Sequence, residues 1–262
     1  MIVIKYGGHV LDDPATNENI ISAIAAYHRN GGKVVVVHGG GPAIEAELKF
    51  HDIPTSMVGG YRVTTPEVME IVQRTLSGSV LRELTNKFIG LGANAVGLST
   101  GDGNTLRAQR FQPTVNGVSA DIGLVGEAQR VDPAFLNLVL EHGYLPIISP
   151  VAVSTGGEPL NINGDIAAGA IAGALGASEI LFITDVAGIY KNWPDPASII
   201  SEISRAELQE ISSTFADGMA PKVRAVLNAL SSGAKQARIF DGRDPNNLEQ
   251  ALHGVGGTVV HA

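Results

Sequence analysis

The chain has 262 residues, of which 44% are hydrophobic and 17% charged, enough apolar material for one large domain or two closely packed lobes. A formal net charge of −8 at pH 7 argues against nonspecific nucleic-acid binding, which needs a basic surface. The absence of cysteine excludes disulfides, thiolate nucleophiles and cysteine-ligated metals, and is compatible with a cytoplasmic protein.

The hydropathy pattern shows neither a signal peptide nor a membrane span. No charged segment followed by an uninterrupted apolar stretch opens the chain, as a signal peptide would require. The most apolar segment, residues 166–183, is rich in Ala and Gly and is interrupted by Glu179, which predicts a helix followed by a strand. We therefore expect a cytoplasmic protein without membrane or nucleic-acid partners.

The predicted strands and helices alternate along the chain. Strands are expected at residues 2–6, 34–38, 95–98, 145–149, 180–184, 238–240 and 258–260. Helices are expected at 19–27, after Pro42, and at 66–76, 80–89, 134–140, 166–175, 205–211 and 223–230. This order predicts the α/β class, with an open, mostly parallel sheet sandwiched between helices in three αβα layers.

Two stretches break the alternation. Residues 107–127 show short polar–apolar alternation around Asn116-Gly117, which predicts a small β-hairpin insertion. Residues 190–200 contain two prolines and are expected to form an irregular loop. A boundary between lobes is weakly marked, and we place it near residue 175, which divides the chain into residues 1–175 and 176–262.

Glycines follow several of the predicted strands. The run at residues 34–42, VVVVHGGGP, is a buried strand that ends in Gly39-Gly40-Gly41, and the first strand ends in Gly7-Gly8. Backbone N–H groups at such a strand end, before a helix, suit an anion such as phosphate, although a lone GGG is also compatible with a tight turn. Residues 99–103 and 184–188 add glycines and polar groups at the same expected edge of the sheet.

Common catalytic motifs are missing. The sequence has no Walker A motif, no G-x-G-x-x-G after the first strand, no H-E-x-x-H, no G-x-S-x-G and no protein-kinase signature. P-loop and dinucleotide-binding functions thereby lose their main support.

Four charged side chains are candidates for chemistry, each with a structural alternative. Lys5 lies within a buried-looking strand, unless that strand is an edge and Lys5 faces solvent. Lys222 opens a helix, where a cation is disfavoured, but it could be an ordinary surface lysine. Asp165 could cap its helix, and Arg62 could either bind a carboxylate or lie on the surface. His38 is expected to be a structural, hydrogen-bonding histidine.

Nine segments in this order resemble the amino acid kinase family, and within it the enzymes that act on N-acetyl-L-glutamate. The resemblance covers nearly the whole chain. The segments are KYGG, VHGGGP, GYRVTTPEV, AVGLSTGDGN, DIGLVGE, LNINGD, LFITDVAGIY, GMAPKV and the closing IFDGR with GGT. It implies transfer of phosphate from MgATP to the γ-carboxylate of N-acetyl-L-glutamate in arginine biosynthesis, with the metal carried by the nucleotide.

The resemblance also implies roles for individual residues. Lys5 and Lys222 would neutralise charge on the transferring phosphoryl group, and Asp165 would orient both lysines. Gly40 and Gly41 would donate N–H groups near the reacting carboxylate. The substrate-binding residues would be Gly40, Gly41, Arg62, Asn161 and Asn163, with Arg62 on the α-carboxylate. The nucleotide-binding residues would be Gly7, Gly8, Thr184, Asp185, Val186, Ala187, Gly188, Ile189, Tyr190, Thr214, Phe215 and Ala216.

A carboxylate nucleophile is ionised at neutral pH, so this reaction needs no general base, which agrees with the lack of an obvious one. The chain departs from the family pattern at Gly164, at residues 80–82 and at Ala220. Because it begins directly at the first strand, it resembles the short homodimeric forms that arginine does not inhibit.

Two alternatives remain open. A sister kinase acting on carrier-linked α-aminoadipate or glutamate would share much of the sequence, although the segment GYRVT favours the free acyl amino acid. A non-catalytic amino-acid sensor on the same fold would not need Lys5, Lys222 and Asp165 together.

Overall fold

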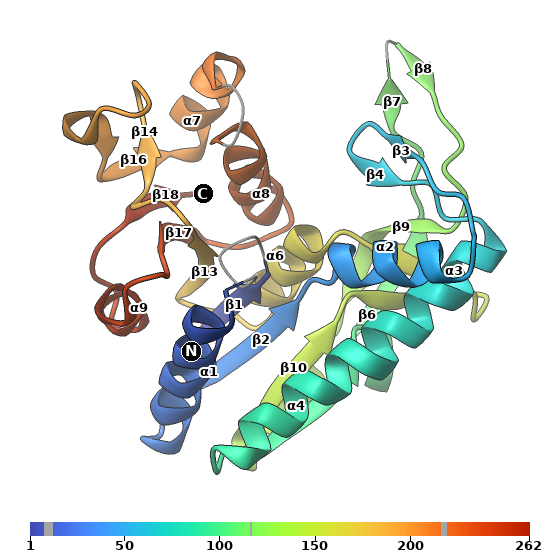
Figure 1. The fold of residues 1–262 in the computed structure, drawn as a ribbon, viewed down its shortest axis with the longest axis horizontal. Coiled ribbons are helices and arrows are strands. Elements are labelled where there is room, and N and C mark those ends of the chain that lie inside the picture. The colour runs from blue at the N-terminus through green and yellow to red at the C-terminus, as the bar shows by residue number, and fades with distance from the viewer. Residues whose placement is uncertain (8–12, 116, 216–218) are drawn as a thin grey trace.

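The computed structural model describes residues 1–7, 13–115, 117–215 and 219–262, and its centre is an eight-stranded sheet (Figure 1). All neighbouring strands are parallel except β17 and β18. In spatial order the strands are β16 (Glu202–Ser204), β18 (Thr258–His261), β17 (Gln236–Asp241), β13 (Glu179–Thr184), β1 (Ile2–Tyr6), β2 (Val34–His38), β10 (Leu145–Ser149) and β5 (Ala95–Ser99).

Helices cover both faces of the sheet. One core cluster joins alternate strand residues such as Ile4 and Val36 to α1 (Pro14–Arg29), α4 (Leu81–Gly90) and α9 (Pro245–Leu252). The other cluster joins Val3 and Val35 to the remaining long helices. These are α2 (Gly41–Phe50), α3 (Pro66–Gln73), α5 (Ala134–Glu141), α6 (Gly164–Ala174), α7 (Arg205–Ile211) and α8 (Met219–Ser231). The predicted three-layer αβα fold is confirmed, and burial on both faces explains the unbroken valine run.

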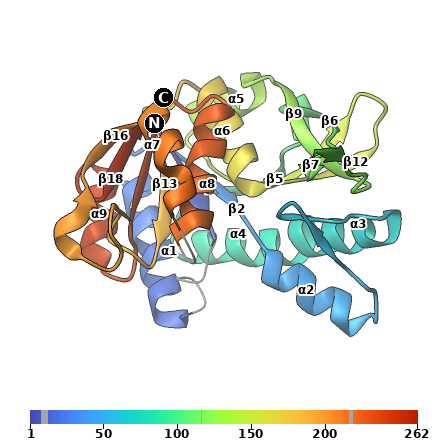
Figure 2. The same cartoon turned by 90° about the horizontal axis from the view of Figure 1, so that it is seen from above.

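The predicted hairpin insertion is present but belongs to a larger unit. The strands β6 (Leu106–Arg110) and β9 (Val125–Val131) pair antiparallel, and they close a small barrel with β11 (Val151–Ser154) and β12 (Pro159–Ile162). A further hairpin of β7 (Thr114–Val115) and β8 (Val118–Ser119) lies between β6 and β9. Figure 2 shows the barrel at the end of the molecule opposite β16 and β18.

Several elements differ from the sequence predictions. The two helices expected at 66–76 and 80–89 form one continuous helix, because a π-helical segment, Arg74–Val80, joins α3 to α4. The expected irregular loop at 190–200 is a hairpin, whose strands are β14 (Ile189–Tyr190) and β15 (Ile199–Ile200). A hairpin of β3 (Met57–Val58) and β4 (Tyr61–Arg62) and the helix α9 were not expected. Strands of two residues are too short to show a period.

The helices α6 and α8 lie unusually close together. A Cβ atom at Gly169 would lie 2.4 Å from Cα of Ala229, and one at Gly173 would lie 2.4 Å from the carbonyl oxygen of Gly233. Because both contacts advance together along the two segments, the helices run parallel. Their first turns therefore begin at the same edge of the sheet, where β1 and β13 also end.

The central sheet is continuous across the lobe boundary expected near residue 175, because β13 pairs directly with β1. The strands on the β13 side all follow residue 178, and those on the β1 side all precede residue 150. The two-lobe division stays a prediction. Within the described ranges, no helix has both the length and the apolar character needed to cross a membrane.

The contact between α6 and α8 generates a stability prediction. Gly169→Ala places a methyl group against the α8 backbone, which cannot rotate away, so we expect a loss of about 1–3 kcal/mol in the free energy of unfolding. Urea denaturation measures it. Gly90→Ala is the control, because a Cβ at this helical residue would meet nothing within 4 Å. Equal stability of Gly169→Ala and wild type would contradict the close contact.

Candidate functional site

Lys5 lies in the middle of the sheet, not on an edge. Its strand, β1, pairs with β13 on one side and with β2 on the other. The Lys5 Nζ atom is 3.2 Å from Oδ1 of Asp165, and the two side chains are 20% and 16% exposed. The edge-strand alternative is therefore wrong, and the structure places a mostly buried ammonium group beside a carboxylate.

Asp165 is available for this ion pair because another residue caps its helix. The Asn163 side chain accepts hydrogen bonds from the backbone N–H groups of Asp165 (2.8 Å) and Ile166 (3.3 Å), so Asn163 is the N-cap of α6. The capping alternative for Asp165 is wrong. Its buried Oδ1 atom lies near Lys5 but has no hydrogen bond of good geometry.

The glycine run after β2 comes close to Lys5. The N–H group of Gly39 donates to the carbonyl oxygen of Tyr6 (2.8 Å), and a Cβ at Gly7 would lie 3.6 Å from Lys5 Nζ. Gly40 is the N-cap of α2 and provides no side-chain cap. A Cβ there would lie 2.5 Å from Leu76 Cδ2, which explains the glycine. The N-terminal end of α2, which carries the positive end of the helix dipole, thus begins just after the segment that bonds to Tyr6, and such an end favours a nearby anion.

His38, the last residue of β2, holds the start of the glycine run through a hydrogen bond. Its Nδ1–H group donates to the carbonyl oxygen of Gly39 at 2.7 Å, and the residue is almost fully buried. Burial lowers the pKa of His38, while this hydrogen bond opposes the shift. The structure therefore agrees with the expectation of a structural, hydrogen-bonding histidine.

A first pocket, of about 230 Å³, collects the expected substrate-binding residues. Gly40, Gly41, Arg62, Asn161 and Asn163 all line it, together with Gly39, Ile44, Met57, Gly60, Tyr61, Leu76, Val125, Pro150, Ile162 and Gly164. This acceptor pocket, as we call it, lies beside the Lys5–Asp165 pair, because Gly164 precedes Asp165 at the start of α6.

Hydrogen bonds hold the hairpin that carries Arg62. The Thr64 hydroxyl donates to the carbonyl oxygen of Arg62 (2.9 Å) and accepts from Nδ2 of Asn161 (3.3 Å). The backbone of Thr64 bonds to Ile122 and Leu124 near the barrel. The Arg62 guanidinium donates to the hydroxyl of Thr55 (3.1 Å). The loop is thereby anchored to the barrel with its arginine at the pocket wall.

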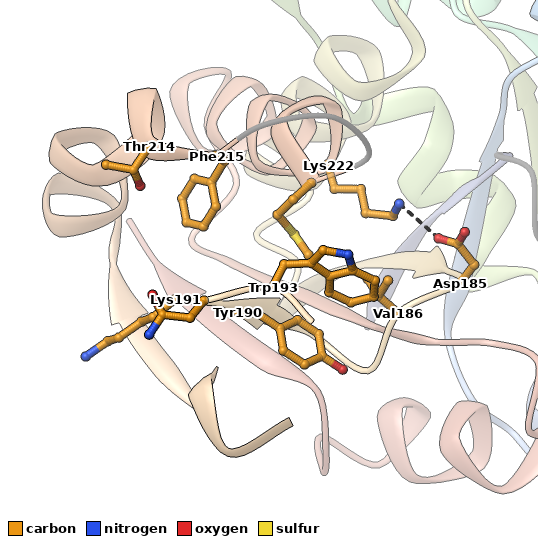
Figure 3. Close-up of a pocket in the computed structure, with 10 residues that line it drawn as sticks. Asp185, Val186, Tyr190, Lys191, Trp193, Thr214, Phe215 and Lys222 are labelled. Atoms are coloured by element: carbon orange, nitrogen blue, oxygen red, sulfur yellow. Dashed lines mark ion pairs between the residues drawn. The ribbon is translucent and has the colours of Figure 1, made fainter. Parts of the chain in front are cut away.

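A second pocket, of about 460 Å³, lies over α8 (Figure 3). We call it the donor pocket. It is lined by Asp185, Val186, Tyr190, Lys191, Asn192, Trp193, Thr214, Phe215, Met219 and Lys222. The Lys222 Nζ atom is 2.9 Å from Oδ1 of Asp185. Lys222 holds the pKa of Asp185 below its usual range, chiefly through their hydrogen bond, against the opposing effect of burial.

The expected nucleotide-binding residues take different positions. Asp185, Val186, Tyr190, Thr214 and Phe215 line the donor pocket, and Gly7 lies beside Lys5. Three others contact the neighbouring strands and do not line the pocket: Thr184, Gly188 and Ile189. The Thr184 hydroxyl donates to the carbonyl oxygen of Phe240 (2.9 Å), and the Ile189 N–H donates to the Thr258 hydroxyl. Gly188 packs closely on that hydroxyl, since a Cβ there would lie 2.4 Å from it. Ala187 is exposed. Gly8 and Ala216 lie outside the described residues.

The helix α8 connects the two pockets. It carries Lys222 in the donor pocket, and its Arg224 guanidinium lies beside Gly60 of the acceptor pocket, where a Cβ would be 2.9 Å from Nη1. Burial raises the pKa of the neighbouring Tyr61, and the Arg224 charge opposes this shift. The expectation that Asp165 orients both lysines is matched by a contact to Lys5, and for Lys222 it stays a prediction.

Sequence reasoning missed Arg224, Met219 and the pocket residues Lys191, Asn192 and Trp193. Arg224 lies two residues after Lys222. For the loop, the available signal was the single tryptophan, which directly precedes Pro194 in a stretch rich in turn residues. Across the described ranges, no group of three or more His, Asp or Glu side chains is arranged to bind a metal ion.

Comparisons with known proteins match these features. The family model described as "Amino acid kinase family" matches residues 1–241. An acetylglutamate kinase from Arthrobacter sp. (strain FB24) is 43% identical over 253 residues, covering 94% of this chain and 82% of that protein. An acetylglutamate kinase from Corynebacterium urealyticum (strain ATCC 43042 / DSM 7109) is 40% identical over 262 residues, covering 99% and 86%.

Among solved structures, N-acetylglutamate synthase from Neisseria gonorrhoeae, complexed with coenzyme A and N-acetyl-glutamate, aligns with a TM-score of 0.80 and 22% identity. The alignment covers all of this chain and 59% of the synthase chain. This chain therefore spans little more than half of that protein, and the likeness is one of fold.

The Lys222–Asp185 pair generates a prediction on titration. Lys222→Met removes the hydrogen bond that lowers the pKa of Asp185, so this pKa should rise, as carboxyl NMR can measure with Asp185→Asn for assignment. The pKa of Asp185 is lower in the folded than in the unfolded protein. The ion pair therefore makes its full contribution to stability above about pH 4, the ordinary pKa range of an aspartate. This contribution disappears as the pH falls through the folded-state pKa of Asp185. An unchanged Asp185 pKa in Lys222→Met would contradict the pairing.

Proposed function

Because the chain belongs to the amino acid kinase family, we propose that it transfers a phosphoryl group from MgATP to the γ-carboxylate of N-acetyl-L-glutamate, a step of arginine biosynthesis. The observation that carries the proposal is the placement of two lysine–aspartate pairs next to two pockets. Lys5–Asp165 adjoins the acceptor pocket, and Lys222–Asp185 lies in the donor pocket, and the helices α6 and α8, which carry Asp165 and Lys222, pack directly against each other.

The reaction follows from charge and position. A carboxylate oxygen of the substrate attacks the γ-phosphorus, the bond to the β,γ-bridging oxygen breaks, and ADP leaves, so no proton has to be removed. The N–H groups of Gly40 and Gly41 face the acceptor, and Arg62 binds its α-carboxylate. Lys5 and Lys222 neutralise the charge that moves between acceptor and donor. Mg²⁺ enters with the nucleotide and shields its phosphates.

The same proposal divides the chain by ligand. Residues 1–175 bind N-acetyl-L-glutamate and form the dimer contact, and residues 176–262 bind ATP. The acceptor pocket is lined by residues from 39 to 164, and the donor pocket by residues from 185 to 222, which supports this division. The enzyme would act in the cytoplasm as a homodimer.

A substrate assay tests the function. Purified protein with MgATP and free N-acetyl-L-glutamate should release ADP and form an acyl phosphate that hydroxylamine traps as a hydroxamate. Turnover with a carrier-linked glutamate or α-aminoadipate, but not with the free compound, would replace this function with the sister activity. ATP and substrate binding without turnover would favour a sensor.

The role of Lys222 predicts a specific kinetic defect. Lys222→Ala should lower kcat about 100-fold or more, the size seen when a charge-stabilising group is lost, while ATP and substrate still bind. Steady-state kinetics with direct binding measurements separates the two effects. Lys235→Ala, which removes an exposed lysine shortly after the same helix, is the control. Wild-type kcat in Lys222→Ala would refute the assignment.

Arg62 should affect the acceptor alone. In Arg62→Lys the planar, bidentate guanidinium is replaced by a point charge, so we expect KM for N-acetyl-L-glutamate to rise about tenfold with KM for ATP unchanged. The exposed Arg130 offers a matched Arg130→Lys control. A change confined to KM for ATP would contradict the role of Arg62 in binding N-acetyl-L-glutamate.

A further inference from the structure

Trp193 is an exposed aromatic side chain in the donor pocket. It is the only tryptophan of the chain, and it is 60% exposed. In Figure 3 its indole lies between the Lys222–Asp185 pair on one side and Phe215 on the other. Large apolar side chains are usually buried, and one that remains exposed inside a pocket offers its ring to a ligand.

A neighbouring ring fixes the orientation of the indole. Tyr190, which is buried in β14, meets Trp193 edge to face, with ring centroids 4.9 Å apart and an interplanar angle of 87°. This arrangement is the favoured one for aromatic pairs. Because Tyr190 is nearly perpendicular to the indole, it can cover at most one of the two faces of that ring, and the residue as a whole is 60% exposed.

Hydrogen bonds also hold the loop that carries Trp193. The loop connects β14 to β15, and the backbone of Lys191 bonds to Ser198 (2.9 Å). The Ser198 hydroxyl lies within hydrogen-bond distance of the carbonyl oxygens of Asn192 (3.0 Å) and Asp195 (2.7 Å), which share its single hydrogen, and the Asp195 N–H donates to the carbonyl oxygen of Asn192 (2.8 Å). The loop is therefore closed on itself, and Trp193 is presented by an ordered turn.

The chemistry of the donor pocket changes along its length. Lys222, with its charge, marks the end at which phosphates would be neutralised. Trp193, Phe215, Val186 and Met219 give the rest of the wall aromatic and apolar character, with Asn192 and Thr214 as polar groups. A ligand with an anionic group at one end and a flat aromatic ring at the other would match the charged and the aromatic parts of the pocket wall.

We propose that Trp193 stacks on the base of the nucleotide and gives the enzyme its preference for purine over pyrimidine triphosphates. The proposal deepens the proposed function, since it takes from it only that a nucleoside triphosphate is the phosphoryl donor. A purine covers more of the indole than a pyrimidine does, and stacking strength grows with the ring area in contact.

The single tryptophan makes binding directly visible. Excited at the indole absorption edge, its fluorescence should change saturably with ATP, ADP and GTP, and with UTP or CTP only at several-fold higher concentration. Inorganic tripolyphosphate, which has charge but no base, should bind without a comparable change. Equilibrium dialysis with labelled nucleotide gives Kd independently of the fluorophore.

Substitutions separate stacking from other roles. In Trp193→Leu the Kd for ATP should rise about tenfold, while the Kd for tripolyphosphate stays within about twofold of wild type. Trp193→Phe should restore most of the ATP affinity. Tyr144→Leu is the control, because Tyr144 is also exposed (47%) but precedes β10 at the opposite edge of the sheet.

Three results would overturn the proposal: unchanged fluorescence at an ATP concentration that dialysis shows to be saturating, wild-type ATP affinity in Trp193→Leu, or equal affinity for UTP and ATP. Weaker binding of both ATP and tripolyphosphate in Trp193→Leu would also overturn it, since the change would then be structural. Fluorescence titration with ATP in a protein that fails to phosphorylate N-acetyl-L-glutamate would refute the proposed function and leave the stacking role standing.

Discussion

The close contact of α6 with α8 is the constraint on which the site depends. Gly169 and Gly173 let the two backbones approach where any side chain would collide, so the two helices pack directly against each other and run parallel. Asp165 lies in the first turn of one helix and Lys222 in the first turn of the other. A shift of α8 along α6 would separate the donor pocket from Lys5 and its partner.

Both lysines are held by carboxylates, which matters in a protein whose net charge is −8. In the Lys5–Asp165 and Lys222–Asp185 pairs, each partly buried ammonium group has a carboxylate within 3.2 Å and 2.9 Å, respectively. The N-terminal ends of α2 and α6 point to the same region. The helix ends thus add partial positive charge beside two lysines whose own charges are balanced by aspartates.

Two hairpins that carry pocket-lining side chains are held by hydrogen bonds. The β3–β4 hairpin, with Arg62, is anchored through Thr64 to Asn161 and to the barrel. The β14–β15 hairpin, with Trp193, is closed by the Ser198 hydrogen bonds. Arg224 brings α8 against the first of them, so the helix that carries Lys222 also touches the loop over the acceptor pocket.

The sequence by itself determined the layered fold and the edge of the sheet at which the expected site residues gather. Long apolar strands with glycines at their ends, alternating with periodic helices, allow few other arrangements, because parallel strands need helical crossovers and their carboxyl ends share one edge. The expected substrate-binding residues accordingly line one pocket.

Only the tertiary structure decided which partner each group has. Whether Lys5 belongs to a central or an edge strand depends on β13, which comes more than 170 residues later. Asn163 and Asp165 are both suited to cap α6, and the structure shows which of these near neighbours does so, whereas the pairing of Lys222 with Asp185 joins residues far apart in the chain through the packing of α8. Such long-range choices leave no local pattern in the chain, and Trp193 acquires its place in the donor pocket in the same way, through pairing of two short strands that show no period of their own.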